Sequence, residues 1–271
     1  MLRRSQLFVP ANEEKKIRKS LALGADSIIF DLEDAVPPSG KAEARKNLGS
    51  LLKELEWNSS QELCVRVNKV GTNSYSADDL AAVKSIRKVD SIVLPKIEAD
   101  ATEIHEYTGK TIIGLVETAR GLNDIGEIAK SKGMVALAFG PQDYANSVKG
   151  NVVAYLSNSS VLSTMVAAAR ANNLDPIDGV YFELANLEGF RETAQIARNL
   201  GCAGKQVVHP SQIAIANEVF SPTKEEILEA TRIVELYERA EKNNTGALRV
   251  DDKLIDAVHY RQAKDLLGRI S

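Results

Sequence analysis

The chain of 271 residues contains only two cysteines, Cys64 and Cys202. Two thiols are too few for a disulfide framework or a multi-thiolate metal site, so the sequence predicts a protein of the reducing cytoplasm. Basic residues are not in excess either, because 34 Lys and Arg stand against 37 Asp and Glu, for a net charge of -3. Proteins that bind nucleic acid usually present a basic surface, so we expect no nucleic-acid partner.

Long hydrophobic runs are also missing from the sequence. A membrane-spanning helix takes about 20 apolar residues, and the core of a signal peptide takes at least about seven. No run reaches the first length, and the apolar stretch near the N-terminus is shorter than the second, so we expect no membrane partner. The chain has no internal repeat, low-complexity tract or interdomain linker.

Short apolar runs rich in β-branched residues alternate with helix-like stretches, a pattern that predicts parallel strands with crossover helices. The expected strands are residues 6–10, 27–34, 63–67, 91–95, 111–117, 135–139, 177–181 and 206–208. These eight strands, in a chain of this length, favour an α/β fold of the (β/α)8 TIM-barrel type. We predict a catalytic barrel domain over residues 1–220. Residues 221–271 are expected to form a helical extension or lid, with a polar turn at 243–253 and a last helix from Leu254.

Charged residues end several of these strands. In a barrel of parallel strands, reactive side chains gather at the rim where the carboxyl ends of the strands lie. Glu117 and Asp143 end adjacent expected strands, and a pair of carboxylates completed by water and substrate is a common protein contribution to a Mg²⁺ site. The alternative is that each carboxylate caps the following helix or pairs with a nearby Lys or Arg.

Arg66 closes a strand that is otherwise apolar. A planar, permanently charged donor at this position suits a carboxylate, a phosphate or a developing oxyanion. It could instead form an ion pair with Asp31 or Glu33 across the barrel mouth, and the two roles are compatible. We interpret Asp31, Glu33 and Asp34 as acids that support metal-bound water or orient Arg66.

Three further features each allow two interpretations. Lys96 ends a strand and could form a Schiff base, although a nearby metal site favours an electrostatic role. His209 could act as a general base or fix the turn before a helix capped by Ser211. The basic face of the first helix, with Lys16 and Lys19, is either solvated or in contact with the phosphates of a nucleotide-bearing substrate.

A series of segments spanning nearly the whole chain resembles the citrate lyase beta subunit-like family. This family belongs to the HpcH/HpaI superfamily of metal-dependent aldolases, with malyl-CoA and citramalyl-CoA lyases. The segments, in order, are LFVPANEEKKIRKSLALGADSIIFDLEDAVPP, VRVN, LPK, GLVETARGL, AFGPQD, IDGVYFELANLEGF, GKQVVHPSQIAIANEVFSP and KLIDAVHYRQAKDLL. The resemblance implies a TIM barrel, Mg²⁺ or Mn²⁺, and a coenzyme A or acyl-carrier thioester as substrate. It also implies a homotrimer or a multiple of it, or citrate lyase partner subunits.

The resemblance also implies roles for individual residues. Glu117 of VETARG and Asp143 of FGPQD fall on the metal ligands, with Glu117 also at the substrate, and Arg66 of VRVN falls on the catalytic arginine. Asp256 of LIDA falls on a catalytic acid that the C-terminal segment contributes to a neighbouring subunit. The lysines of the first helix fall near the nucleotide part of the thioester. The implied activity is a carbon–carbon lyase that releases a short acyl-CoA and a keto acid. The alternatives are a thioester hydrolase and a citrate lyase subunit that acts on a carrier-bound thioester.

The sequence departs from the family pattern at a few positions. The family commonly has a second acidic residue shortly after the metal aspartate, whereas this chain has none between Tyr144 and Gly150. Ala11 stands where a glycine is frequent, and Asn158 stands where an arginine is common. Because these positions lie near the expected substrate site, the sequence leaves the hydroxyacyl group undetermined.

Overall fold

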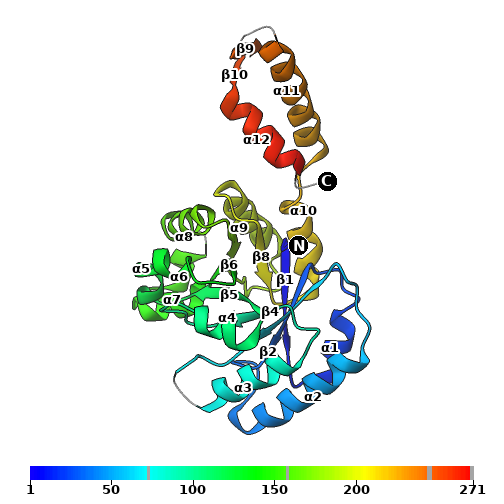
Figure 1. The fold of residues 1–271 in the computed structure, drawn as a ribbon, viewed down its shortest axis with the longest axis vertical. Helices are drawn as coiled ribbons and strands as arrows, with labels where there is room; N and C mark the ends of the chain where they lie inside the picture. The colour runs from blue at the N-terminus through cyan, green and yellow to red at the C-terminus, as the bar shows by residue number, and fades with distance from the viewer. Residues whose placement is uncertain (72–73, 157–158, 243–245, 269–271) are drawn as a thin grey trace. The chain divides into compact units, whose positions relative to one another are not determined.

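The computed structural model describes residues 1–71, 74–156, 159–242 and 246–268. The chain divides into two compact units, Met1–Phe220 and Ser221–Ser271 (Figure 1). The first unit is an α/β barrel, and the second is formed by helices and a short hairpin. In the described part of the chain, no helix is both long and apolar enough to cross a membrane.

The first unit is a closed barrel of parallel strands in sequential order, which confirms the predicted (β/α)8 TIM barrel. The strands are β1 (Ser5–Pro10), β2 (Ser27–Asp31), β3 (Glu62–Arg66), β4 (Ser91–Leu94), β5 (Thr111–Val116), β6 (Met134–Phe139), β7 (Asp175–Asp178) and β8 (Gly204–Val207). Strand β8 pairs with β1 and closes the barrel. The register pairs Asp31 with Arg66, so the last residues of β2 and β3 lie side by side.

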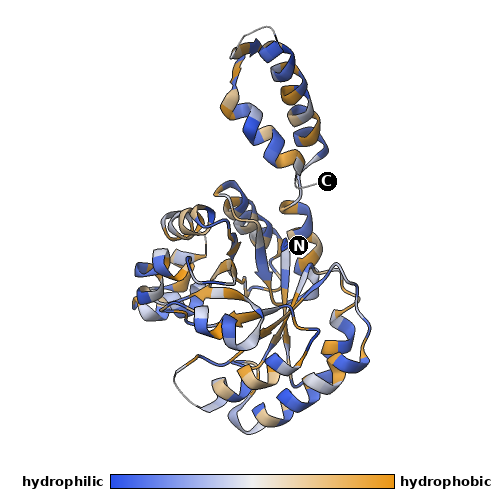
Figure 2. Cartoon of the chain, viewed as in Figure 1, coloured by the Kyte–Doolittle hydropathy of each residue, from blue (hydrophilic) through white to orange (hydrophobic). Residues whose placement is uncertain are grey.

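Helices follow the strands and cover the outside of the barrel. They are α1 (Glu14–Ser20), α2 (Lys41–Glu54), α3 (Ser74–Ser85), α4 (Thr102–Thr108), α5 (Ala119–Asn123), α6 (Ile125–Ile128), α7 (Pro141–Ser147), α8 (Ser159–Ala171), α9 (Leu187–Asn199) and α10 (Pro210–Val219). Short 3-10 helices occupy Pro38–Gly40 and Val152–Tyr155. Figure 2 shows hydrophobic strands at the centre and helices that alternate hydrophobic and hydrophilic residues, as expected for helices with one buried face.

The barrel has two separate apolar cores. The larger one lies between strands and helices, and the smaller one, which includes Ile29, Cys64, Val93 and Ile113, fills the barrel interior. Burial raises the pKa of the Cys64 thiol well above its ordinary value. Cys64 is therefore a packing residue and not a reactive thiol.

Strand β7 begins and ends earlier than the expected range of 177–181. The chain leaves the sheet at Gly179, where an added Cβ would lie 2.4 Å from Pro141 Cδ and 2.5 Å from the Phe139 carbonyl oxygen. The apolar residues that follow, including Val180 and Phe182, line a cavity and do not extend the strand. The apolar run was a correct sign of burial: Tyr181 is buried against Phe190, and Val180 lines the cavity.

The second unit consists of α11 (Lys224–Lys242), β9 (Ala247–Val250), β10 (Lys253–Asp256) and α12 (Ala257–Gly268). The predicted polar turn at 243–253 followed by a helix from Leu254 is wrong, because β9 and β10 form an antiparallel hairpin there. Residues 243–245 of that turn lie outside the described residues. Helix α12 begins only after Asp256, whose Oδ1 accepts the backbone N–H of Val258 at 2.9 Å and satisfies a free donor of the first turn.

Candidate active site

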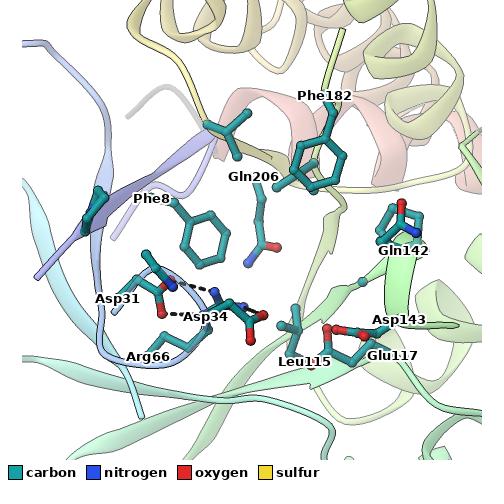
Figure 3. Close-up of a pocket in the computed structure, with 16 residues that line it drawn as sticks. Phe8, Asp31, Asp34, Arg66, Leu115, Glu117, Gln142, Asp143, Phe182 and Gln206 are labelled. Atoms are coloured by element: carbon teal, nitrogen blue, oxygen red, sulfur yellow. Dashed lines mark hydrogen bonds and ion pairs between the residues drawn. The ribbon is translucent and has the colours of Figure 1, made fainter. Parts of the chain in front are cut away.

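A cavity of about 480 Å³ lies at the carboxyl ends of the barrel strands (Figure 3). Its walls come from the ends of strands and from the loops that follow them. The lining residues are Phe8, Pro10, Asp31, Asp34, Ala35, Arg66, Leu115, Glu117, Gly140, Pro141, Gln142, Asp143, Val180, Phe182, Gln206 and Val208. The barrel therefore gathers Arg66 and the two expected metal ligands at one opening, as the strand-end pattern predicted.

Arg66 is held at one side of the cavity by Asp31, which ends β2 (Figure 3), and by Glu33 of the loop that follows. Its Nε and Nη2 each donate to one carboxylate oxygen of Asp31 at 2.7 Å, and Nη1 lies 3.0 Å from Glu33 Oε2. Burial acts to lower the pKa of Arg66, but the hydrogen bonds to Asp31 and the neighbouring carboxylates outweigh it and raise the pKa above its usual value. The guanidinium is thus permanently charged and fixed in orientation, so the ion-pair interpretation of Arg66 is confirmed.

The acidic loop itself is fixed by a lysine that the sequence analysis did not select. Lys41 is buried, and its Nζ donates to the carbonyl oxygens of Leu32 and Glu33, each at 2.8 Å. Asp31 completes the turn by accepting the backbone N–H of Glu33 at 2.9 Å. The only sequence signal was a lysine at the start of a helix, which is usually a solvated residue.

Glu117 and Asp143 lie opposite Arg66 (Figure 3). Glu117 directly follows β5 and is buried. Asp143 does not end β6 as expected but lies in the first turn of α7. Strand β6 ends at Phe139, and Pro141 begins the helix, because proline is favoured in a first helical turn.

Lys96 joins the acids of this side to those near Arg66. Its Nζ lies 2.8 Å from Glu33 Oε1, 3.2 Å from Asp143 Oδ2 and 3.8 Å from Glu117 Oε1. Burial acts to lower the pKa of Lys96, but the bond to Glu33 and the charges of the other two carboxylates raise it well above its usual value. A Schiff base requires a neutral amine, so this environment argues against that interpretation and favours an electrostatic role.

The positive charge of Lys96 does not fully offset the effect of burial on Glu117. Burial raises the pKa of Glu117 to about 8, and the nearby ammonium of Lys96 lowers it only in part. A carboxylate in this state gains from an additional cation, because a metal ion replaces the proton and supplies the missing charge. The donor set therefore fits a hard divalent cation.

The raised pKa of Glu117 predicts that protein free of metal loses stability as the pH rises. The folded state holds this proton more tightly than the unfolded state, whose carboxyl group has a pKa of 4.5. The contribution to stability is complete below that value and is lost as the pH rises through about 8. We expect the Tm measured in EDTA to fall from about pH 6 to about pH 9, and to fall less in Glu117→Gln. Equal slopes for the two proteins would contradict the assignment.

Other predicted residues lie away from the cavity lining. His209 is the N-cap of α10: its Nδ1 accepts the backbone N–H of Ser211 at 3.2 Å, and the Gln212 side chain accepts the backbone N–H of His209 at 3.3 Å. The structure thus supports the turn-fixing interpretation of His209, with His209 and not Ser211 as the cap. Lys16 and Lys19 are exposed on α1, and Lys16 pairs with Glu13 at 2.6 Å.

Asp256 belongs to the second unit and ends β10. Its Oδ1 lies 2.8 Å from His259 Nδ1, and this bond, with those from the backbone of Val258 and His259, lowers the pKa of Asp256. The carboxylate is thus ionised and half exposed. Asn158, singled out as a departure from the family pattern, lies outside the described residues.

The uncharged residues of the cavity were not predicted from the sequence. Phe8 packs against Arg66, with 4.9 Å between its ring centroid and the guanidinium carbon. Gln206 is 2% exposed, and its side chain points into the middle of the cavity (Figure 3). Its Nε2 donates to Gln6 Oε1 at 3.3 Å. Strand alternation could have placed Phe8, Gln6 and Gln206 on the inner face, but not which of them reaches the cavity.

The chain is similar in sequence and fold to several known proteins. The HpcH/HpaI aldolase/citrate lyase family profile matches residues 4–210. A (3S)-malyl-CoA thioesterase of Cereibacter sphaeroides is 34% identical, over 98% of this chain and 94% of the relative. An L-malyl-CoA/beta-methylmalyl-CoA lyase of the same species is 30% identical, over 96% of this chain and 92% of the relative. The crystal structure of CitE from Mycobacterium tuberculosis, in complex with magnesium, acetoacetate and coenzyme A, is 28% identical, with a TM-score of 0.82 over 98% of this chain and 97% of that chain.

Proposed function

Because this chain belongs to the HpcH/HpaI aldolase/citrate lyase family, we propose that it is a Mg²⁺-dependent carbon–carbon lyase acting on a hydroxyacyl-CoA thioester. The products would be a short acyl-CoA and a keto acid. The observation that carries the proposal is the placement of a fixed, charged arginine opposite two carboxylates across one cavity. The similar CitE structure, which contains magnesium and coenzyme A, supports the choice of metal and thioester.

Glu117 and Asp143 would hold the Mg²⁺, or Mn²⁺ in its place. The space beside Glu117 is left by Gly140, where an added Cβ would lie 2.4 Å from Glu117 Oε2. When bound, the metal acts as a Lewis acid that polarises the oxygens of the hydroxy acid. On this side the protein keeps Glu117 in place through the backbone N–H of Lys96, which donates to Glu117 Oε1 at 2.7 Å.

Arg66 would act on the thioester side of the substrate. Cleavage breaks the bond between the thioester's α-carbon and the carbon that carries the hydroxyl group, and the electron pair moves toward the thioester carbonyl oxygen. A guanidinium held by Asp31 cannot turn away, so Arg66 offers donors already oriented toward this developing charge. The hydroxyl group becomes the carbonyl group of the keto acid, and its proton would pass to water.

Asp256 is proposed to carry the proton of the α-carbon, from the C-terminal unit of a neighbouring copy in a homotrimer or a multiple of it. In condensation, its ionised, half-exposed carboxylate would remove the α-proton. In cleavage, the carboxylate would first take up a proton from water and then deliver it to the α-carbon. The basic face of α1, with Lys16 and Lys19, would meet the phosphates of the coenzyme A nucleotide.

Mixing two inactive variants tests the shared site. Asp256→Ala and Arg66→Ala subunits, mixed under conditions in which subunits exchange, should regain activity, because a hybrid assembly contains cavities with both residues intact. Random mixing should restore about a quarter of the sites. Exchange is verified by native mass spectrometry, and each variant incubated alone serves as the control. No recovery after verified exchange would contradict the shared site.

Gly140→Ala tests the metal ligands without removing a carboxylate. The added methyl group collides with Glu117 and should weaken Mg²⁺ binding by about 10–100-fold. Gly126→Ala, where the new Cβ meets nothing within 4 Å, is the matched control. Isothermal titration with Mg²⁺ measures both variants, and equal affinities would mean that Glu117 does not bind the metal.

Thioester hydrolysis is the second candidate function. It is favoured by the 34% identity to a (3S)-malyl-CoA thioesterase, which extends over 98% of this chain. Water would attack the thioester carbonyl carbon while Arg66 stabilises the oxyanion, and free coenzyme A and the intact hydroxy acid would leave. A citrate lyase subunit acting on a carrier-bound thioester, together with partner subunits, is the remaining alternative.

A single assay separates these functions. The purified protein is incubated with Mg²⁺ and malyl-, methylmalyl-, citramalyl- or citryl-CoA, and the products are identified by mass spectrometry. A short acyl-CoA with an equimolar keto acid, lost in EDTA, would support the lyase and identify its substrate. Free coenzyme A with intact hydroxy acid would support the hydrolase. No turnover of any free thioester would contradict both and favour the carrier-bound substrate.

A further inference from the structure

Lys96 combines an unusual backbone conformation with an unusual set of side-chain partners. Its φ is 50°, in the left-handed region that few residues other than glycine adopt. This conformation lets the backbone N–H donate to Glu117 Oε1 at 2.7 Å while the side chain reaches Glu33 at 2.8 Å. Lys96 thus contacts the acid that follows β5 through its backbone N–H, and an acid of the loop after β2 through its ammonium.

The ammonium of Lys96 lies where the two proposed metal ligands face each other. It is 3.2 Å from Asp143 Oδ2 and 3.8 Å from Glu117 Oε1. Within the described ranges, no other cationic side chain forms an ion pair with Glu117 or Asp143. Arg66 is already engaged by Asp31 and Glu33 on the opposite side.

These contacts place an ammonium and a divalent ion in competition for the same oxygens. Two cations cannot approach closely without mutual repulsion, which is strong in a partly buried site. Of the contacts of Lys96 Nζ, the one to Glu33 is shortest, and Glu33 is not one of the proposed ligands. Glu33 therefore offers a place to which the ammonium can withdraw.

We infer that Lys96 is a positioning residue that substitutes for the metal ion in the metal-free protein, holding Glu117 and Asp143 together, and that it withdraws to Glu33 when the metal binds. The inference rests on the proposed metal site. Lys96 keeps the acidic site ordered between metal-binding events. Because its ammonium competes with the metal ion for the same oxygens, it also weakens metal binding.

The test measures metal binding and stability rather than turnover. Lys96→Met keeps the length of the side chain but removes its charge. Titration calorimetry of the EDTA-treated, dialysed protein at about pH 9, above the pKa of about 8 of Glu117, should show Mg²⁺ binding about tenfold tighter than in wild type. The metal-free variant should melt at a lower temperature than wild type, so that saturating Mg²⁺ raises its Tm by more. Lys96→Arg, which retains a charge, should bind Mg²⁺ with nearly wild-type affinity.

Lys132→Met is the matched control, because Lys132 pairs with Glu106 at 3.0 Å on the surface and should leave Mg²⁺ affinity unchanged. Equal or weaker Mg²⁺ binding by a folded Lys96→Met protein would overturn the inference. If that variant does not fold, Lys96→Gln, which keeps a hydrogen-bond donor, replaces it under the same criterion. A wild-type protein that binds no Mg²⁺ would instead overturn the proposed metal site, and the role of Lys96 with it.

Discussion

Replacing Arg66 with glutamine should lower kcat for the thioester reaction by about 10²–10³-fold, the usual effect of losing an oriented donor to a developing oxyanion. The structure explains the size of the effect. The guanidinium is fixed by two bonds of 2.7 Å to Asp31 and lines the cavity, so no reorientation is needed when charge develops. Steady-state kinetics at saturating thioester measures the loss, and an unchanged kcat would remove Arg66 from the mechanism.

The loss of a buried ion pair must be separated from the loss of catalysis. Asp31 is 3% exposed, and removal of the partner of a buried charge typically costs about 3–5 kcal/mol of stability. Arg45→Gln is the matched control, because Arg45 and Arg66 have side chains of equal exposure, 12%, and Arg45 pairs with Asp78 and Asp79 away from the cavity. We expect Arg45→Gln to lower Tm while keeping kcat near that of wild type.

Glu117→Gln and Asp143→Asn should each abolish the response of activity to Mg²⁺ and lower kcat/KM by about 10³-fold or more, since Lewis-acid stabilisation is worth several kcal/mol. Both substitutions keep the shape of the side chain, so the loss reports the charge. In Glu117→Gln the Tm in EDTA should be equal to or higher than that of wild type at about pH 9, because a buried carboxylate that resists ionisation has been removed.

Glu98→Gln provides the comparison for these two variants. Glu98 is also an acid of a loop after a strand, and it pairs with Lys69 at 3.2 Å, but it does not line the cavity of the proposed active site. We expect Mg²⁺ dependence and kcat to remain close to wild type. A Mg²⁺ response retained in either Glu117→Gln or Asp143→Asn would show that the carboxylate it replaces is not a ligand.

The sequence predicted the barrel well because its signals are local. Each strand is a short apolar run bounded by helix-forming residues, and these patterns depend on neighbours along the chain. The predictions failed where the same local pattern of polar or apolar residues occurs in two different kinds of structure. Val180 and Tyr181 look like strand residues because they are apolar, but Val180 lines the cavity and Tyr181 packs against Phe190. Residues 247–253 look like part of a polar turn because the hairpin they enter carries many exposed side chains.

The candidate site was predictable only in part, for a related reason. Strand-end position identified Arg66, Glu117 and Lys96, because a parallel barrel brings all such ends to one rim. It did not identify Lys41, whose burial against two loop carbonyls follows from the fold of that loop. Asp143 lines the cavity as expected, although it lies within a helix and not at the end of a strand.

By itself, the sequence determined the fold class and the residue types at the barrel rim, because both follow from periodicity and from the order of residues along the chain. Which charged side chains come into contact depends on the tertiary structure. The register of β2 against β3 places Asp31 beside Arg66, and the left-handed turn at Lys96 brings its ammonium to Glu33 and Asp143. These contacts join residues far apart in sequence, and their energies depend on burial and distance, which exist only once the barrel has closed.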